Sequence, residues 1–158
     1  MIRYTSSLED VTAERLTGFW VGWPDRPSPE AHLAMLAGSE AFVLAVDDDD
    51  GGRVVGFANA VGDGVLAAYI PCLEVLPGHQ GRGIGSELVR RLLDLLSDRY
   101  MVDLVCDEDV MPFYERLGLL RHGAMILRRR GAVAEANRRL AGEPGRTVPA
   151  AGGPETDR

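Results

Sequence analysis

The order of apolar and polar positions along the chain predicts a small mixed sheet with helices between some of its strands. Runs rich in Val, Ile, Leu and aromatic residues predict strands at residues 2–5, 42–46, 54–61, 65–76, 101–106 and 125–127. Short turns join the second, third and fourth of these runs, so we expect an antiparallel meander there. Pro71 lies inside the fourth run, where the missing backbone N–H predicts a bulge or an unpaired edge.

Helical periodicity and end signals predict helices within residues 7–19, 29–37, 84–96 and 109–117. Ser28 and Pro29 are residue types preferred just before a helix and at its first position, and Gly38 suits its end. The clearest helix is 84–96. Because a strand precedes it and another follows it, we expect these two strands to be parallel, with a right-handed crossover. Its expected apolar face consists of Leu88, Val89, Leu92, Leu93, Leu95 and Leu96.

The length of 158 residues fits one domain, and the charge along it is uneven. Residues 1–127 contain 10 arginines and 20 acidic residues, whereas residues 128–158 contain 7 arginines and 4 acidic residues. The composition changes near residue 128 to Arg, Ala, Gly and Pro, so we assign a folded domain to residues 1–128 and a tail to residues 129–158. Within this tail, residues 132–140 could form a helix, and the chain after Gly142 is expected to be disordered.

The acidic charge of the first 127 residues argues against nucleic acid and anionic membranes as partners, and it mildly favours cationic small molecules. Solubility alone would also account for this charge. Cys72 and Cys106 form no disulfide framework, and neither they nor the aspartate run 47–50 show metal-ligand spacing, so we expect no metal. The N-terminus lacks the pattern of a signal peptide and no apolar run could span a bilayer, so we expect a cytoplasmic location.

The segment between the fourth strand and the clearest helix has the composition of an anion-binding loop. Gly81, Gly83 and Gly85 leave the backbone open to a ligand, and the first N–H groups of a helix lack internal acceptors. The helix dipole favours an anion at the same place. No Gly-Lys-Ser/Thr follows, so this is not a Walker loop, and the third glycine of a dinucleotide fingerprint is absent. A glycine-rich turn without a ligand is the alternative.

Three segments together carry a resemblance to a known family. Gln80, Gly83 and Gly85 match the cofactor motif (Gln/Arg)-x-x-Gly-x-(Gly/Ala). Residues 73–77 read Leu-Glu-Val-Leu-Pro and match a splayed strand that ends in Val-x-Pro. Residues 113–118 match Phe-Tyr-x-x-x-Gly. With these motifs in this order, the chain resembles the GNAT family, the GCN5-related N-acetyltransferases.

The resemblance covers residues 1 to about 128 and implies an α/β fold with a mixed sheet. This sheet has an antiparallel N-terminal meander, a parallel pair at the cofactor site and helices on both faces. It also implies a site for acetyl-CoA or another acyl-CoA, whose pyrophosphate the backbone N–H groups of residues 82–86 would hold. The strand edge at 73–75 would pair with the pantetheine arm. Asp107 stands where many members have an asparagine, and its carboxylate could accept from a pantetheine N–H. The residues expected to bind the cofactor are Leu73, Val75, Gln80, Gly81, Arg82, Gly83, Ile84, Gly85, Ser86 and Asp107.

The resemblance makes Tyr114 the expected general acid, because coenzyme A leaves as a thiolate and a positioned phenol can return a proton to the sulfur. A buried tyrosine with only a structural role is the alternative. Glu74 is the expected general base, since it is the only carboxylate on the strand beside the expected thioester. Asp103, Asp107 and ordered water are rivals for this role. A covalent acyl-cysteine mechanism is disfavoured, because neither cysteine has an evident activating partner.

The acceptor is expected near the Gly- and Pro-rich segment 18–27, where Trp20 and Trp23 could wall a hydrophobic or cationic pocket or simply cover the core. The expected function is transfer of an acetyl group from acetyl-CoA to a primary amine, by direct attack in a ternary complex. The acceptor could be a small-molecule amine or a protein N-terminus, and the acidic charge favours a small cationic amine. The alternative is a non-catalytic acyl-CoA-binding sensor or regulatory module. A homodimer is compatible with the sequence.

Overall fold

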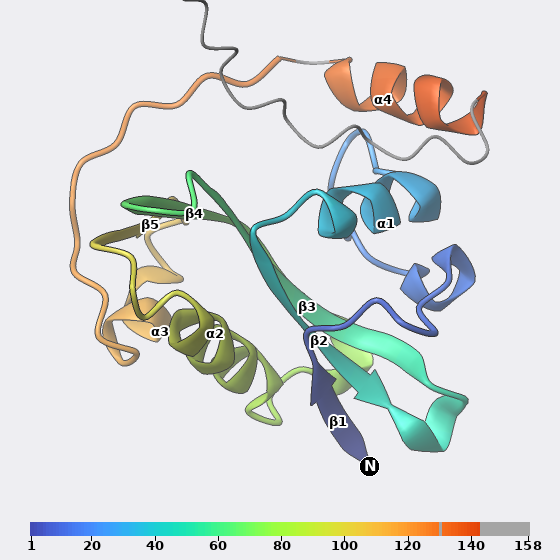
Figure 1. Cartoon of the computed structure of the whole chain (residues 1–158), viewed down its shortest axis with the longest axis horizontal. Coiled ribbons are helices and arrows are strands. Elements are labelled where there is room, and N and C mark those ends of the chain that lie inside the picture. The colour runs from blue at the N-terminus through green and yellow to red at the C-terminus, as the bar shows by residue number, and fades with distance from the viewer. Residues whose placement is uncertain (130, 143–158) are drawn as a thin grey trace, which may run out of the picture.

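The computed structural model describes residues 1–129 and 131–142 and shows a five-stranded mixed sheet (Figure 1). The strands lie in the order in which they occur in the chain, and only the last pair, β4 and β5, is parallel. Their bounds are β1 (Ile2–Thr5), β2 (Ala41–Asp47), β3 (Arg53–Gly62), β4 (Ala67–Val75) and β5 (Met101–Leu104). The predicted meander followed by a parallel pair is therefore confirmed.

Helices cover both faces of this sheet, as predicted (Figure 1). One face carries α2, which contacts β2, β3 and β4, and α3 lies beside it. The other face carries the short helix η1, with α1 packed on it and α4 packed on α1. The helices are η1 (Ala13–Leu16), α1 (Pro29–Ala37), η2 (Asp48–Asp50), η3 (Pro77–His79), α2 (Ile84–Leu95), α3 (Met111–Glu115) and α4 (Ala132–Ala141).

The two helices with the clearest local signals form where the sequence predicts them. The Ser28 hydroxyl accepts a hydrogen bond of 3.1 Å from the backbone N–H of Ala31, which caps α1 at its start. In α2, the side chains of Leu88, Val89 and Leu92 are completely buried. Leu95 is 49% exposed, so our assignment of this residue to the buried face is wrong. A helix in contact with a sheet buries only one stripe, and Leu95 lies beside it.

Pro71 marks the point where β4 and β5 separate. The parallel pairing joins residues 67–70 of β4 to residues 101–104 of β5 and ends there. From Pro71 to Val75, β4 pairs with β3 alone among the described strands, and the register with β3 shifts between Asn59 and Val61. This confirms the expected irregular, unpaired edge and leaves a gap between the diverging strands.

Two predicted elements do not form. Of the helix expected within residues 7–19, only the single turn η1 is present, because local side-chain bonds compete with the helix. The backbone N–H of Ser7 donates to the Thr5 hydroxyl, that of Glu9 donates to the Ser7 hydroxyl, and Asp10 adopts a φ of 65°. The strand expected at residues 125–127 is also wrong: these residues are extended but pair with no strand among the described residues.

The helix expected at residues 132–140 is confirmed as α4, which is tied to the chain before α1. The Asn137 side chain accepts from the backbone N–H of Ser28 and donates to the carbonyl of Arg26, both at 2.9 Å.

The disorder expected after Gly142 lies outside the described residues. The division at residue 128 stays a prediction. Within the described ranges, no helix has the length and apolar character needed to cross a membrane.

Candidate active site

A cavity of about 290 Å³ occupies the gap between the diverging ends of β4 and β5. It brings together residues from separate parts of the chain: the segment after η1, β3, β4, the end of β5 with the loop after it, and α3. Its aromatic and polar lining residues are Trp20, Trp23, Phe57, Cys72, Glu74, Cys106, Asp107 and Tyr114. The structure therefore places both expected catalytic residues, both tryptophans, Leu73 and Asp107 around one space.

Tyr114 faces this cavity from α3 and is nearly enclosed, with 9% of its surface exposed. Among the described residues, its hydroxyl has no hydrogen-bond partner. Burial raises the pKa of Tyr114 to about 12, with smaller contributions from Cys106 and Cys72. The side chain is therefore a neutral phenol at physiological pH and retains a proton that it can donate.

Glu74 holds the tryptophan segment against β4. One carboxylate oxygen accepts from the backbone N–H of Trp20 at 2.8 Å, and the other accepts from that of Val21 at 3.1 Å. Trp20 is 4% exposed and adopts a φ of 66°, a left-handed conformation that an L-residue rarely adopts without compensating contacts. The two hydrogen bonds from Glu74 supply such contacts. They join β4 to a segment more than 50 residues away in the sequence.

The glycine loop before α2 has an open backbone. Gly81 and Gly83 adopt φ values of 73° and 78°, and a Cβ added at either would meet nothing within 4 Å. The first hydrogen bond of α2 runs from the Glu87 N–H to the Gly83 carbonyl at 3.1 Å, so the N–H groups at residues 84–86 have no acceptor within the helix. The Gln80 side chain donates to the Val75 carbonyl at 2.9 Å and fixes the loop to the end of β4.

The glycine loop does not line the cavity, but it lies next to the helix that carries Tyr114. A Cβ on Gly85 would lie 3.7 Å from the Phe113 ring and 3.8 Å from the Val75 side chain. The Phe113 ring in turn packs edge-on against Tyr114, with 4.9 Å between ring centroids. A ligand that extends from the loop to the cavity would thus pass the end of β4.

Our sequence reasoning considered Cys72 and Cys106 as nucleophiles and did not place them in the site. Both line the cavity. Burial raises the pKa of Cys72 to about 11 and also raises that of Cys106, so both thiols remain protonated at neutral pH. Alternation along β4 could have placed Cys72 beside Glu74, two residues on. No local signal links Cys106 to the site.

Residues 8–119 match the model of the acetyltransferase (GNAT) family. The chain belongs to the GNAT family of acetyltransferases. Acetyl transfer is the general reaction of this family, and its members generally use acetyl-CoA and act on amine acceptors. The resemblance stated from the motifs is therefore confirmed.

Two solved structures are similar to this GNAT chain in both fold and sequence. A candidate acetyltransferase from Deinococcus radiodurans is 51% identical with a TM-score of 0.79, and the match covers 86% of this chain and 92% of the other. A GNAT-family acetyltransferase from Streptococcus pneumoniae is 31% identical with a TM-score of 0.66, over 82% of this chain and 99% of the other. This agreement confirms the expected α/β fold class.

Among curated proteins, serotonin N-acetyltransferase 2, chloroplastic, from rice (Oryza sativa subsp. japonica) is 30% identical over 74% of this chain. The uncharacterized N-acetyltransferase ycf52 of Porphyra purpurea is 31% identical over 64% of it. The matches span 60% and 59% of these two proteins, so the GNAT chain corresponds to about three fifths of their length. The name of the rice protein places it in the chloroplast, whereas a cytoplasmic location stays a prediction for this chain.

Proposed function

We propose that this chain transfers an acetyl group from acetyl-CoA to the primary amine of a small molecule. The observation that carries the proposal is the cavity between β4 and β5, which faces Tyr114 and lies beside the open glycine loop. The loop suits an anionic cofactor because its free N–H groups stand at the positive end of the α2 dipole. The unpaired edge of β4 from Pro71 to Val75 suits an extended amide chain, which it would bind as a strand.

In the proposed reaction, the acceptor nitrogen attacks the thioester carbonyl directly, without an acyl-enzyme. A C–N bond forms and the C–S bond breaks, and Tyr114 gives its proton to the departing sulfur. Backbone N–H groups near Val75 polarise the carbonyl. Asp107 lies in the cavity wall, where its carboxylate is available to a pantetheine N–H or to the acceptor. The amine proton leaves to water, since both carboxylate oxygens of Glu74 already accept backbone N–H groups. The protonated cysteines support this direct route.

The cavity favours an amine with an aromatic or apolar body. Trp20 and Trp23 form one wall, with 5.1 Å between their ring centroids, and such faces bind both rings and cations. Glu74 and Asp107 add negative charge, which attracts a protonated amine before it is deprotonated for attack. The similarity to a rice enzyme named as a serotonin N-acetyltransferase supports this substrate class.

The cofactor part of the proposal is tested by Gly83→Glu. The new carboxylate would stand in front of the free N–H groups and repel phosphates, so we expect the affinity for acetyl-CoA, measured by isothermal titration, to fall at least about tenfold. The matched control is Gly64→Glu, in the turn between β3 and β4, since its φ of 75° imposes a similar backbone strain to the 78° of Gly83. Equal affinities for the two variants would overturn the assignment of the loop.

Glu74→Gln separates two roles for this residue. Because both carboxylate oxygens accept backbone N–H groups, we propose that Glu74 mainly positions the tryptophan wall. The glutamine amide retains one oxygen that can accept a backbone N–H. Its NH2 group faces the other backbone N–H, and two donors cannot bond, so the segment at Trp20 is held less firmly. We expect the KM for the amine to rise about tenfold, with kcat within about twofold and an unchanged pH profile of kcat. Asp94→Asn, on the exposed side of α2, is the control. A large fall in kcat with a lost acidic limb would instead identify Glu74 as the general base.

A further inference from the structure

Residues 119–129, which follow α3, are extended, and all of them except Leu119 are exposed. We call residues 119–129 the strap; Figure 1 shows it arching outside the β4–β5 end of the sheet. Leu119 donates its N–H to the Tyr114 carbonyl, but within the described ranges no backbone–backbone hydrogen bond involves residues 120–128. Four large apolar side chains of the strap are exposed: Leu120 (92%), Met125 (99%), Ile126 (62%) and Leu127 (71%). A monomer gains nothing from such exposure.

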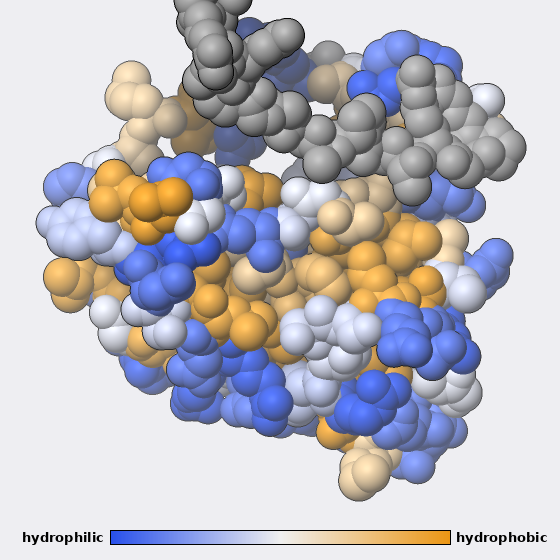
Figure 2. Space-filling view, viewed as in Figure 1, coloured by the Kyte–Doolittle hydropathy of each residue, from blue (hydrophilic) through white to orange (hydrophobic). Residues whose placement is uncertain are grey.

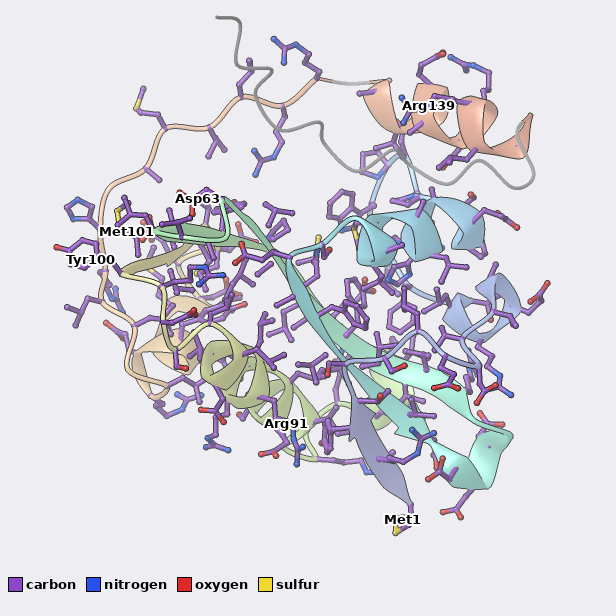
Figure 3. The ribbon with its side chains drawn as sticks, viewed as in Figure 1. Met1, Asp63, Arg91, Tyr100, Met101 and Arg139 are labelled. Atoms are coloured by element: carbon purple, nitrogen blue, oxygen red, sulfur yellow. The ribbon has the colours of Figure 1, made fainter. Side chains whose placement is uncertain are left out.

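The outer edge of β5 is unpaired as well. Within residues 1–129 and 131–142, β5 is the last strand of the sheet and pairs only with β4, so its other edge presents N–H and C=O groups that no described strand bonds. Exposed apolar residues gather around it: Tyr100 (85%), Met101 (37%), Val105 (38%), Val65 (78%) and Leu66 (49%). Figure 3 labels Tyr100 and Met101 at this end, and Figure 2 shows apolar surface where the β3–β4 hairpin lies. No Pro or Lys protects this edge.

The charges of these two elements are complementary. The strap ends in Arg128 and Arg129, and in the part of the chain that the structure describes, Arg128 bonds only to the carbonyl of Leu127. β5 contains Asp103, and the loop after it contains three further acidic residues, Asp107, Glu108 and Asp109. If the strap is added as a strand beside β5, its arginines would therefore lie near the acidic side chains of β5 and of the loop after it, next to exposed apolar residues.

Both ends of the strap are already fixed within its own chain. The Arg121 guanidinium bonds to Glu115 of α3 at 2.6 Å, and Asn137 of α4 bonds to residues before α1. Between these anchors the strap leaves the outer edge of β5 open, so each chain presents an unpaired extended segment next to an unpaired β5 edge. A two-fold axis satisfies both at once, because each copy can give its strap to the β5 edge of the other and the exchange is then closed between two chains.

We propose that two copies of this chain form a dimer in which the strap of each copy pairs with β5 of the other. The occupant of the β5 edge is thus a second copy, and the six-stranded sheets that result bury the exposed leucine, isoleucine and methionine side chains. The sequence pattern at residues 125–127 is that of a strand whose pairing partner lies in another chain.

Sedimentation equilibrium and hydrogen exchange on the full-length chain test this proposal together. We expect twice the mass of one chain at micromolar concentration, and slow exchange at the amides of residues 124–128 that becomes fast when dilution dissociates the dimer. Since these amides have no backbone acceptor among the described residues of their own chain, their protection reports the pairing directly. A monomer whose strap amides are protected at every concentration would place the strap on its own β5. A monomer with unprotected strap amides would also overturn the dimer.

Variants distinguish this interface from any other. In the double variant Met125→Asp, Leu127→Asp, two exposed apolar side chains become acidic and face the carboxylates near β5. We expect the dimer to weaken at least about a hundredfold, with no loss of thermal stability in the monomer. Leu95→Asp changes an exposed leucine on α2 and is expected to remain dimeric. Circular dichroism verifies separately that the strap variant is folded. A folded strap variant that dimerises as tightly as the parent would contradict the proposal.

Discussion

Replacement of Tyr114 by phenylalanine is expected to lower kcat about 10²- to 10⁴-fold and to leave acetyl-CoA affinity within about twofold. The hydroxyl faces the cavity, has no hydrogen-bond partner among the described residues, and belongs to a side chain that is 9% exposed. Removing it deletes a proton donor while the ring continues to pack against Phe113. The loss should therefore fall on the chemical step, which steady-state release of coenzyme A thiol measures.

The high pKa of Tyr114 also predicts how kcat depends on pH. Burial raises it to about 12, so the phenol keeps its proton through the physiological range and its ionisation should produce no alkaline limb in kcat below about pH 10. Tyr100→Phe, on an 85% exposed side chain, is the matched control and should behave as the parent. Parent-like kcat in Tyr114→Phe would contradict the role of general acid. A parent with tight acetyl-CoA binding but no turnover on any amine would favour the sensor alternative.

Acidification from pH 6.5 to pH 4 is expected to remove about 3 kcal/mol of stability through one side chain, His32. This imidazole is completely buried among Phe19, Trp20 and Phe57, and neither ring nitrogen has a hydrogen-bond partner in the described part of the chain. Burial lowers its pKa from 6.5 to about 4. As the pH falls, His32 of the unfolded chain therefore becomes protonated near pH 6.5, whereas His32 of the folded chain becomes protonated only near pH 4. The stabilisation is complete above pH 6.5 and is lost as the pH falls.

Urea denaturation of the parent and of His32→Leu at pH 7 and pH 4 measures this contribution. Leucine is similar in volume and cannot be protonated, so the variant should lose about 3 kcal/mol less than the parent over this interval. Carboxylates contribute to acid unfolding in both proteins, and the difference between the two removes their effect. Equal losses would show that His32 is protonated in the folded state or reaches solvent before unfolding.

Elements with their own local signals could be predicted from the sequence. Ser28 and Pro29 define the start of α1, and the leucine stripe defines α2. Pro71 correctly predicted the place where β4 loses one of its neighbours. The helix expected within residues 7–19 was wrong because Thr5 and Ser7 bond to nearby backbone N–H groups, a competition that apolar periodicity does not reveal.

The candidate site could be predicted only where a motif was contiguous. The glycine loop and Tyr114 each belong to such a motif, and the structure brings them together through Gly85 and Phe113. The hydrogen bonds between Glu74 and the Trp20 segment span 54 residues, and no local pattern encodes them. The strand expected at residues 125–127 fails for a related reason, since an apolar run predicts an extended segment but does not identify a neighbouring strand, and none pairs with it among the described residues.

Isothermal titration of acetyl-CoA into the full-length chain tests most directly whether the chain binds the acyl donor. We expect saturable binding of one cofactor per chain, weakened when the phosphates of the nucleotide are removed, because free N–H groups at the start of α2 would bind them. No binding at millimolar acetyl-CoA would contradict the proposed function, since the roles proposed for the glycine loop, the β4 edge and Tyr114 all require this ligand.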